Sequence, residues 1–162
     1  MAETASVNSL TAEEKLVLGE RMYREGILPN GEPIQAIVSA DVPVDGRMFT
    51  CVNCHQRSGL GSEEGSIITW PINGKELYTP RRRTGAWNAD KQKQGPGVTQ
   101  RWSLPSQYQA ADARPAYTDE TLAQLLREGV APDGRILERG MPRYQINDSD
   151  MTVLTHYHAK SF

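Results

Sequence analysis

The feature that most constrains this chain is the run CVNCH at residues 51–55, which contains both of its cysteines and one of its three histidines. Two thiols separated by two residues are used in three chemistries: a redox disulfide, half of a zinc site, and thioether attachment of haem. Each of these three chemistries keeps the reactive side chains of the motif close together. The fold of the chain must therefore accommodate a group of reactive side chains at residues 51–55.

The surrounding sequence separates the three chemistries. A thioredoxin-like pair needs a strand before it and a helix opening at the first cysteine within a βαβ pattern, and no such pattern surrounds Cys51. A structural zinc site takes four ligands, and the remaining histidines, His156 and His158, barely complete that set. A histidine directly after the second cysteine is what haem attachment requires, because the thiols add to the porphyrin edge and the imidazole reaches the iron. The sequence therefore predicts one haem c, covalently attached through Cys51 and Cys54, with His55 on the iron; a chance motif with a surface disulfide is the alternative.

Length and composition limit the class of protein. A chain of 162 residues suits one domain with a hydrophobic core, so we expect a single domain over residues 1–162. The hydrophobic fraction is 38%, and no window approaches the run of about 20 apolar residues that spans a bilayer. The net charge of −2 argues against a nucleic-acid partner, which would need a strongly basic surface. The first residues lack the basic and apolar segments of an export signal, so the chain is either cytoplasmic or exported with its signal removed.

Helix signals occur near both ends of the chain. Thr11 and Glu14 form a capping-box signature in a helix predicted over residues 10–26. Thr118 is the predicted N-cap of a second helix over residues 117–129, whose apolar face is made by Leu122, Leu125 and Leu126. A last helix is predicted over residues 147–160.

The segments between these helices are less regular. Residues 27–48 combine short apolar residues with an Asn30-Gly31 turn, which suggests a hairpin-like excursion. Residues 56–116 are rich in Gly, Pro and Arg and contain all three tryptophans. A stretch this long without periodicity is either disordered or wrapped around something that supplies a core, and the tryptophans favour the second interpretation. A covalent haem would supply that core.

Residues from both ends of the chain resemble the class I c-type cytochromes. In that family the N- and C-terminal helices cross through a small residue and an aromatic on one helix and a leucine and an aromatic on the other, and Gly19, Tyr23, Leu154 and Tyr157 match this pattern. The resemblance implies a mostly α-helical class I cytochrome c fold, in which the N- and C-terminal helices cross and long loops wrap one haem. The longer spans before Cys51 and after His55 resemble the larger periplasmic monohaem cytochromes of metal- or electrode-respiring bacteria.

The resemblance also implies the surroundings of the iron. The loop WPING at residues 70–74 resembles the family segment whose backbone carbonyl accepts a hydrogen bond from the proximal imidazole, which implies that Trp70 or Pro71 orients His55. Met141, in a Met-Pro pair before the last helix, matches the family's sixth ligand, and Pro142 favours an extended backbone there. The alternatives to Met141 as sixth ligand are Met22, Met48, Met151, His156 and His158.

The middle of the chain is basic and holds candidates for contacts with the haem propionates. Residues 56–117 carry nine bases and five acids, with Arg81, Arg82 and Arg83 at their centre. Guanidinium groups suit buried carboxylates, although a solvated basic loop explains the same residues equally well. The three tryptophans, each of which is either a propionate donor or ordinary core, are Trp70, Trp87 and Trp102.

With both axial positions filled, the resemblance implies an electron-transfer protein rather than an enzyme. It would be exported to the periplasm and dock transiently with redox protein partners, with a monomer favoured. The alternatives are a haem enzyme or subunit, peroxidase-like or sulfur-oxidising, and a sensor of diatomic gases. In each of them Met141 would leave the iron.

Overall fold

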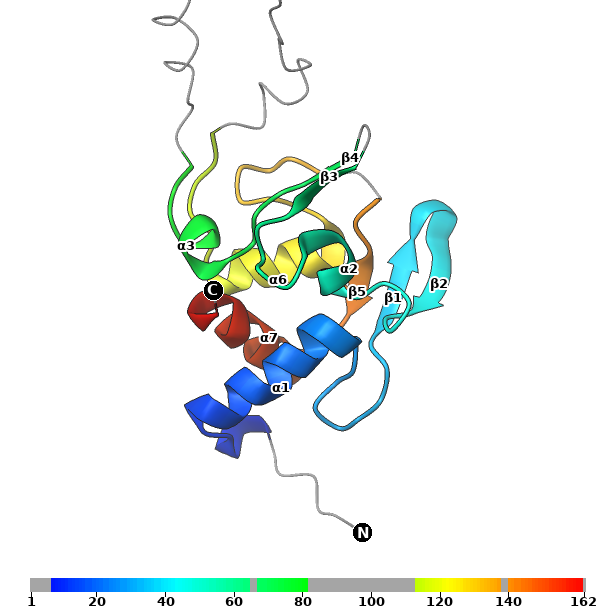
Figure 1. The fold of residues 1–162 in the computed structure, drawn as a ribbon, viewed down its shortest axis with the longest axis vertical. Coiled ribbons are helices and arrows are strands. Elements are labelled where there is room, and N and C mark those ends of the chain that lie inside the picture. Colours follow the sequence, from blue (N-terminus) through cyan, green and yellow to red (C-terminus); the bar gives the residue numbers. More distant parts are fainter. Residues whose placement is uncertain (1–6, 65–66, 82–112, 138–139, 162) are drawn as a thin grey trace, which may run out of the picture.

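The computed structural model describes residues 7–64, 67–81, 113–137 and 140–161 (Figure 1). Within these residues, no helix is both long and apolar enough to cross a bilayer. The elements in chain order are η1 (Val7–Ser9), α1 (Ala12–Glu25), β1 (Gln35–Val38), η2 (Ser39–Asp41), β2 (Val42–Asp45), α2 (Cys51–His55), β3 (Ser62–Glu64), β4 (Ile67–Thr69), α3 (Gly74–Leu77), α6 (Asp119–Glu128), β5 (Arg143–Gln145) and α7 (Asp148–Lys160).

Helices α1 and α6 begin and end where the sequence predicts. The Thr11 hydroxyl accepts from the Glu14 N–H at 3.2 Å, and the Glu14 carboxylate accepts from the Thr11 N–H at 2.7 Å. This capping box satisfies two backbone donors that the helix itself cannot satisfy. Gly26 ends α1 and Gly129 ends α6, with φ of 68° and 76°, a left-handed conformation that glycine adopts without steric cost. Both predicted helices are confirmed, and α7 confirms the helix predicted over residues 147–160.

Helices α1 and α7 cross and pack against each other in the lower part of Figure 1. At the crossing, a Cβ on Gly19 would stand 2.4 Å from Tyr157 Cβ and 2.8 Å from the Val153 carbonyl oxygen. One turn further along α1, Tyr23 is completely buried, and its ring centroid lies 5.6 Å from that of Tyr157. The absence of a side chain at residue 19 lets the two backbones approach this closely. The predicted meeting of Gly19 and Tyr23 with Tyr157 is therefore confirmed.

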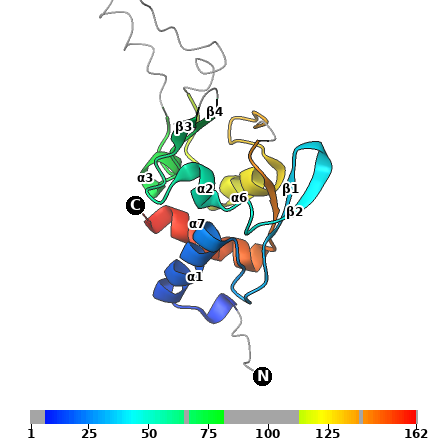
Figure 2. The same cartoon turned by 45° about the vertical axis from the view of Figure 1, so that its right-hand side comes forward.

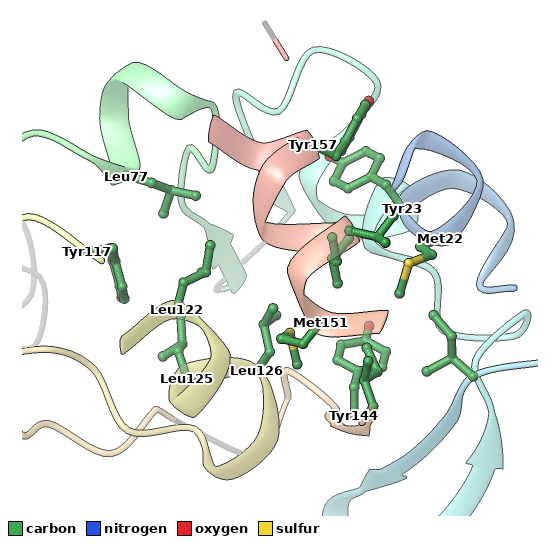
Figure 3. Packing of buried hydrophobic residues seen from close by; sticks show 14 of the residues in the cluster. Met22, Tyr23, Leu77, Tyr117, Leu122, Leu125, Leu126, Tyr144, Met151 and Tyr157 are labelled. Carbon is green, nitrogen blue, oxygen red and sulfur yellow. The ribbon is translucent and has the colours of Figure 1, made fainter. Parts of the chain in front are cut away.

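The hydrophobic core fills the space between these two helices, α6 and the sheet (Figure 3). The predicted apolar face of α6 is buried, with Leu122, Leu125 and Leu126 between 2% and 5% exposed. Burying each such side chain contributes about 1.5–3 kcal/mol to folding. Tyr117 and Leu77 lie on one side of the cluster and Tyr23 and Met22 on the other, with Met151 between them, so the core extends from the helix α3 to the helix α1.

A three-stranded antiparallel sheet in the order β2-β1-β5 covers one side of the core. Ala36 of β1 pairs with Tyr144 of β5, and both are buried, so this face of the sheet belongs to the core. The hairpin predicted over residues 27–48 is confirmed, but its turn is η2 rather than Asn30-Gly31. The Asn30-Gly31 turn instead closes a smaller loop, which is bridged by Ile27 and Pro33.

The predicted mostly α-helical class I cytochrome c fold is wrong. In the described residues, five α-helices accompany the three-stranded sheet and a separate β3-β4 pair. The span between α1 and Cys51, which is longer than the resemblance implies and where a hairpin is predicted, supplies two strands of the main sheet. The third strand of the main sheet is β5, and its residues were expected to form a loop before the last helix. Much of the middle segment that was expected to wrap a haem, residues 82–112, lies outside the described residues.

The helix crossing yields a stability prediction. Because the Cβ of Gly19→Ala would overlap both Tyr157 and the α7 backbone, we expect the free energy of unfolding to fall by about 1–3 kcal/mol. Denaturant titration measures this change. The control is Gly140→Ala, where nothing lies within 4 Å of the added Cβ. Equal effects at residues 19 and 140 would show that the crossing tolerates a methyl group.

Candidate cofactor site

The short helix α2 carries the whole CVNCH motif and packs against α1. Cys51 is partly buried, Cys54 is exposed, and both thiols are free. Burial raises the pKa of the Cys51 thiol to about 12, so this thiol stays protonated at neutral pH. Redox-active dithiols depend on a lowered thiol pKa, so the environment of Cys51 gives no support to a thioredoxin-like function.

His55 is held by the loop that follows the motif. Its Nδ1 lies 2.9 Å from the backbone carbonyl oxygen of Trp70, which confirms the predicted hydrogen bond and identifies Trp70 rather than Pro71 as the acceptor. When Nδ1–H donates to a carbonyl, Nε2 carries the lone pair and can bind a metal. Burial lowers the pKa of His55, while the Trp70 carbonyl acts in the opposite direction. The net direction favours the neutral imidazole, which is the form that ligates iron.

Side chains of the β3-β4 pair cap the backbone carbonyls at the end of α2. The Cys54 carbonyl accepts from the Thr69 hydroxyl at 2.8 Å and from the Ser62 hydroxyl at 3.0 Å. The His55 carbonyl accepts from the Gly61 N–H at 3.1 Å. A Cβ on Gly61 would stand 1.9 Å from the Thr69 carbonyl oxygen, so this contact requires glycine. The second cysteine and the histidine are therefore fixed by a hairpin whose strands the sequence did not predict.

The chain reverses at Gln56, directly after His55, in an unusual conformation. Gln56 has φ 63° and ψ 168°, a region in which a residue other than glycine costs on the order of 1–3 kcal/mol. The Tyr23 hydroxyl donates to the Gln56 carbonyl at 2.6 Å, and this bond joins α1 to the end of the motif. Burial raises the pKa of Tyr23, so its hydroxyl remains a donor throughout the neutral range.

His158 on α7 contacts the loop of residues 70–74 from the side of the core. It is 2% exposed, its ring meets the Tyr23 ring edge-on at 5.6 Å, and its Nδ1 lies 3.3 Å from the Ile72 carbonyl. Ile72 follows two residues after Trp70, so one histidine of α7 contacts the loop that orients another histidine. Burial lowers the pKa of His158 to about 4. Since its ring lies within the core, His158 is not available as a sixth ligand.

Met141 lies on the loop just before β5. It is partly buried and packs against the core cluster that Cys51 also contacts. Met22 and Met151 are 1% and 3% exposed and belong to the core itself. Met48 is 69% exposed, but it is only three residues from Cys51. Burial thus excludes Met22 and Met151 as ligands, and Met141 remains the stronger candidate.

The structure brings together only part of the predicted propionate set. The Arg81 guanidinium carbon lies 4.8 Å from the centroid of the Trp70 ring, a cation-π contact next to the carbonyl that orients His55. The other members of the set lie outside the described residues, and they are Arg82, Arg83, Trp87 and Trp102.

The residues of the motif can be compared with what a metal ion and a haem each require. Across the described ranges, no group of three or more His, Cys, Asp and Glu side chains is placed to hold a metal ion. A porphyrin iron needs only axial ligands from the protein. Met48, Phe49 and Leu60 flank α2 in sequence, Ile136 lies on the loop leading to Met141, and they are 69%, 38%, 61% and 78% exposed. Large exposed apolar side chains before and after the motif in sequence are compatible with an apolar disc attached through its thiols.

Comparisons of this chain with protein-family models, with curated proteins and with solved structures found no match. The resemblance to c-type cytochromes therefore depends on the motifs within the chain itself. The motif can be read from the sequence itself, and the resemblance to c-type cytochromes implied the role of the loop around Trp70. The roles of Thr69, Ser62 and His158 were not predicted, because each acts through a backbone carbonyl and leaves no pattern in the sequence.

The burial of His158 predicts a pH dependence of stability. Its pKa is about 4 in the folded protein, against an ordinary value of 6.5 for an exposed histidine, so the unfolded chain binds the proton more tightly. The free energy of unfolding should therefore fall as the pH drops from 6.5 to about 4, by about 3 kcal/mol in total. His158→Phe should reduce this fall, as measured by denaturant titration at several pH values.

The matched control for this prediction is His156→Phe on the same helix. This variant retains His158, so it should retain the fall in stability. A pH dependence that His158→Phe leaves unchanged would contradict the assignment.

Proposed function

We propose that this protein is a monohaem c-type cytochrome that carries one electron at a time between redox partners. Cys51 and Cys54 would hold the haem by thioether bonds, with His55 and Met141 as the axial ligands. The observation that carries the proposal is the hydrogen bond from His55 Nδ1 to the Trp70 carbonyl within a Cys-x-x-Cys-His motif. With Nδ1–H donating to this carbonyl, the lone pair is on Nε2, where a metal ion can bind it.

The haem, when bound, supplies a ferrous/ferric couple. The residues of the chain determine its ligation. The carbonyl of Trp70 fixes the tautomer of His55, and the bonds to the carbonyls of Cys54 and Gln56 hold the motif between α1 and the β3-β4 pair. As the second protein ligand, the Met141 sulfur would favour the ferrous state relative to a second histidine. With His55 and Met141 both bound to the iron, no position would be left on it for a substrate.

This ligation implies a carrier rather than an enzyme. Redox partners would dock weakly and briefly over the exposed edge of the haem. Attachment of haem through thioethers implies export, so we propose a periplasmic location. The net charge of −2 suggests no preference for nucleic acid.

Covalent attachment is the first test. Produced in a host that attaches haem to exported proteins, the protein should keep its haem through denaturing electrophoresis, as detected by haem staining and intact mass. The double variant Cys51→Ala with Cys54→Ala should lose all of it, because no thiol remains to form a thioether. Asn53→Ala, an exposed position inside the motif, should keep it. Covalent haem in the double variant, or none in the parent protein, would refute the proposed function.

The sixth ligand is the second test. In the ferric protein, Met141→Ala should abolish the sulfur-to-iron charge-transfer band, and the reduced variant should bind carbon monoxide rapidly where the parent binds it slowly. Met48→Ala is the control, since Met48 is exposed and lies next to the motif. A band that survives in Met141→Ala would refute the ligand assignment. Rapid carbon monoxide binding or peroxide turnover by the parent protein would instead favour a sensor or a haem enzyme.

A further inference from the structure

The loop that carries Met141 is anchored at its start by the end of α6. After Gly129, the chain turns back on itself, as Figure 2 shows between α6 and β5, with an isolated bridge between Val130 and Ile136. The Leu137 N–H then donates to the Gly129 carbonyl at 2.8 Å. This bond places Leu137 beside the C-terminus of α6. Leu137 precedes Met141 by four positions.

The side chain of Arg143 connects the two ends of this loop. Its guanidinium donates to the Leu137 carbonyl at 2.6 Å and to the Met141 carbonyl at 2.8 Å. The group lies directly against Gly129, where a Cβ would stand 2.0 Å from the guanidinium carbon. A planar guanidinium can donate to two carbonyls at once, which a single ammonium does less well. Glycine at 129 therefore both ends α6 and leaves room for Arg143.

The backbone of Arg143 is itself fixed relative to the CVNCH motif. Arg143 pairs with Ile37 in the sheet, and its neighbour Tyr144 donates through its hydroxyl to the Phe49 carbonyl at 2.7 Å. Phe49 precedes Cys51 by two residues. The strand β5 thus contacts the Met141 loop through one side chain and the segment leading into the motif through the next.

We infer that Arg143 is a positioning residue for Met141 and keeps its sulfur on the iron, an inference that rests on the proposed function. Arg143 holds the Met141 carbonyl and the Leu137 carbonyl together, and so opposes movement of the Met141 backbone. Arg143 would act on the iron only through that backbone, by keeping the Met141 sulfur where it would exclude external ligands.

The test compares carbon monoxide binding, the charge-transfer band and the midpoint potential in the intact haem-loaded protein. Arg143→Gln removes the double bridge, and we expect the association rate of carbon monoxide with the reduced protein to rise by about tenfold or more. The charge-transfer band of the ferric protein should weaken and the potential should fall, because a weaker thioether bond stabilises the ferrous state less. Gly129→Ala should act in the same direction, since its Cβ displaces the guanidinium.

The matched control is Arg127→Gln. Arg127 likewise donates from its side chain to a backbone carbonyl, that of Ile146 at 2.9 Å, and pairs with Asp148, but it lies at the other end of β5 from Met141. It should leave the three ligation signals unchanged even if it lowers stability. If Arg143→Gln and Gly129→Ala both bind carbon monoxide at the parent rate with an intact band, the inference is wrong and the proposed function stands. If the parent protein carries no covalent haem, both are wrong.

Discussion

The burial of Tyr23 is the interaction on which the rest of the structure depends. Its ring packs against both Tyr157 and His158 of α7, so it extends the helix crossing that begins at Gly19. Its hydroxyl reaches out of the core to the Gln56 carbonyl, at the point where the chain reverses after His55. One side chain therefore links the packing of the terminal helices to the conformation of the motif. An apolar ring of the same size would pack the helices, but it would leave the Gln56 carbonyl and the strained backbone beside it without this support.

The main sheet positions the part of the candidate site that carries Met141. The hairpin of β1 and β2 adds a surface on which residues 143–145 can pair, and that pairing fixes Arg143 and Tyr144. Tyr144 is 6% exposed, and its contact with the Phe49 carbonyl joins the sheet to the segment before Cys51. The strands that make the expected cytochrome c fold wrong are thus the elements that tie the Met141 loop to the motif. The same three strands therefore make the fold differ from the expected one and set the positions of Arg143 and Tyr144.

How much the sequence predicts depends on the range of the interaction. Thr11 and Thr118 mark helix starts correctly, because a cap forms between residues three apart and needs nothing else from the fold. The hydrogen bond of His55 was implied by the resemblance of residues 70–74 to a segment of the c-type cytochromes, which left Trp70 and Pro71 open as acceptors until the structure identified Trp70. The strand β5 was missed because three residues carry no periodicity, and their partner β1 lies about a hundred positions earlier in the chain. The turn of the hairpin was misplaced because Asn30-Gly31 is a strong turn signal that here closes a smaller loop.

The two axial sides of the proposed haem differ in how they are held. On the His55 side, Tyr23, Thr69 and the Trp70 carbonyl each contribute a separate hydrogen bond from a different part of the chain. On the Met141 side, the Arg143 guanidinium binds two backbone carbonyls at once. Among the side-chain contacts of the described residues, loss of Arg143 removes two bonds together, whereas each bond on the first side comes from a different residue. On the proposed function, the methionine side is therefore the one at which a change of one residue would most readily convert a closed electron carrier into a haem protein with an open iron.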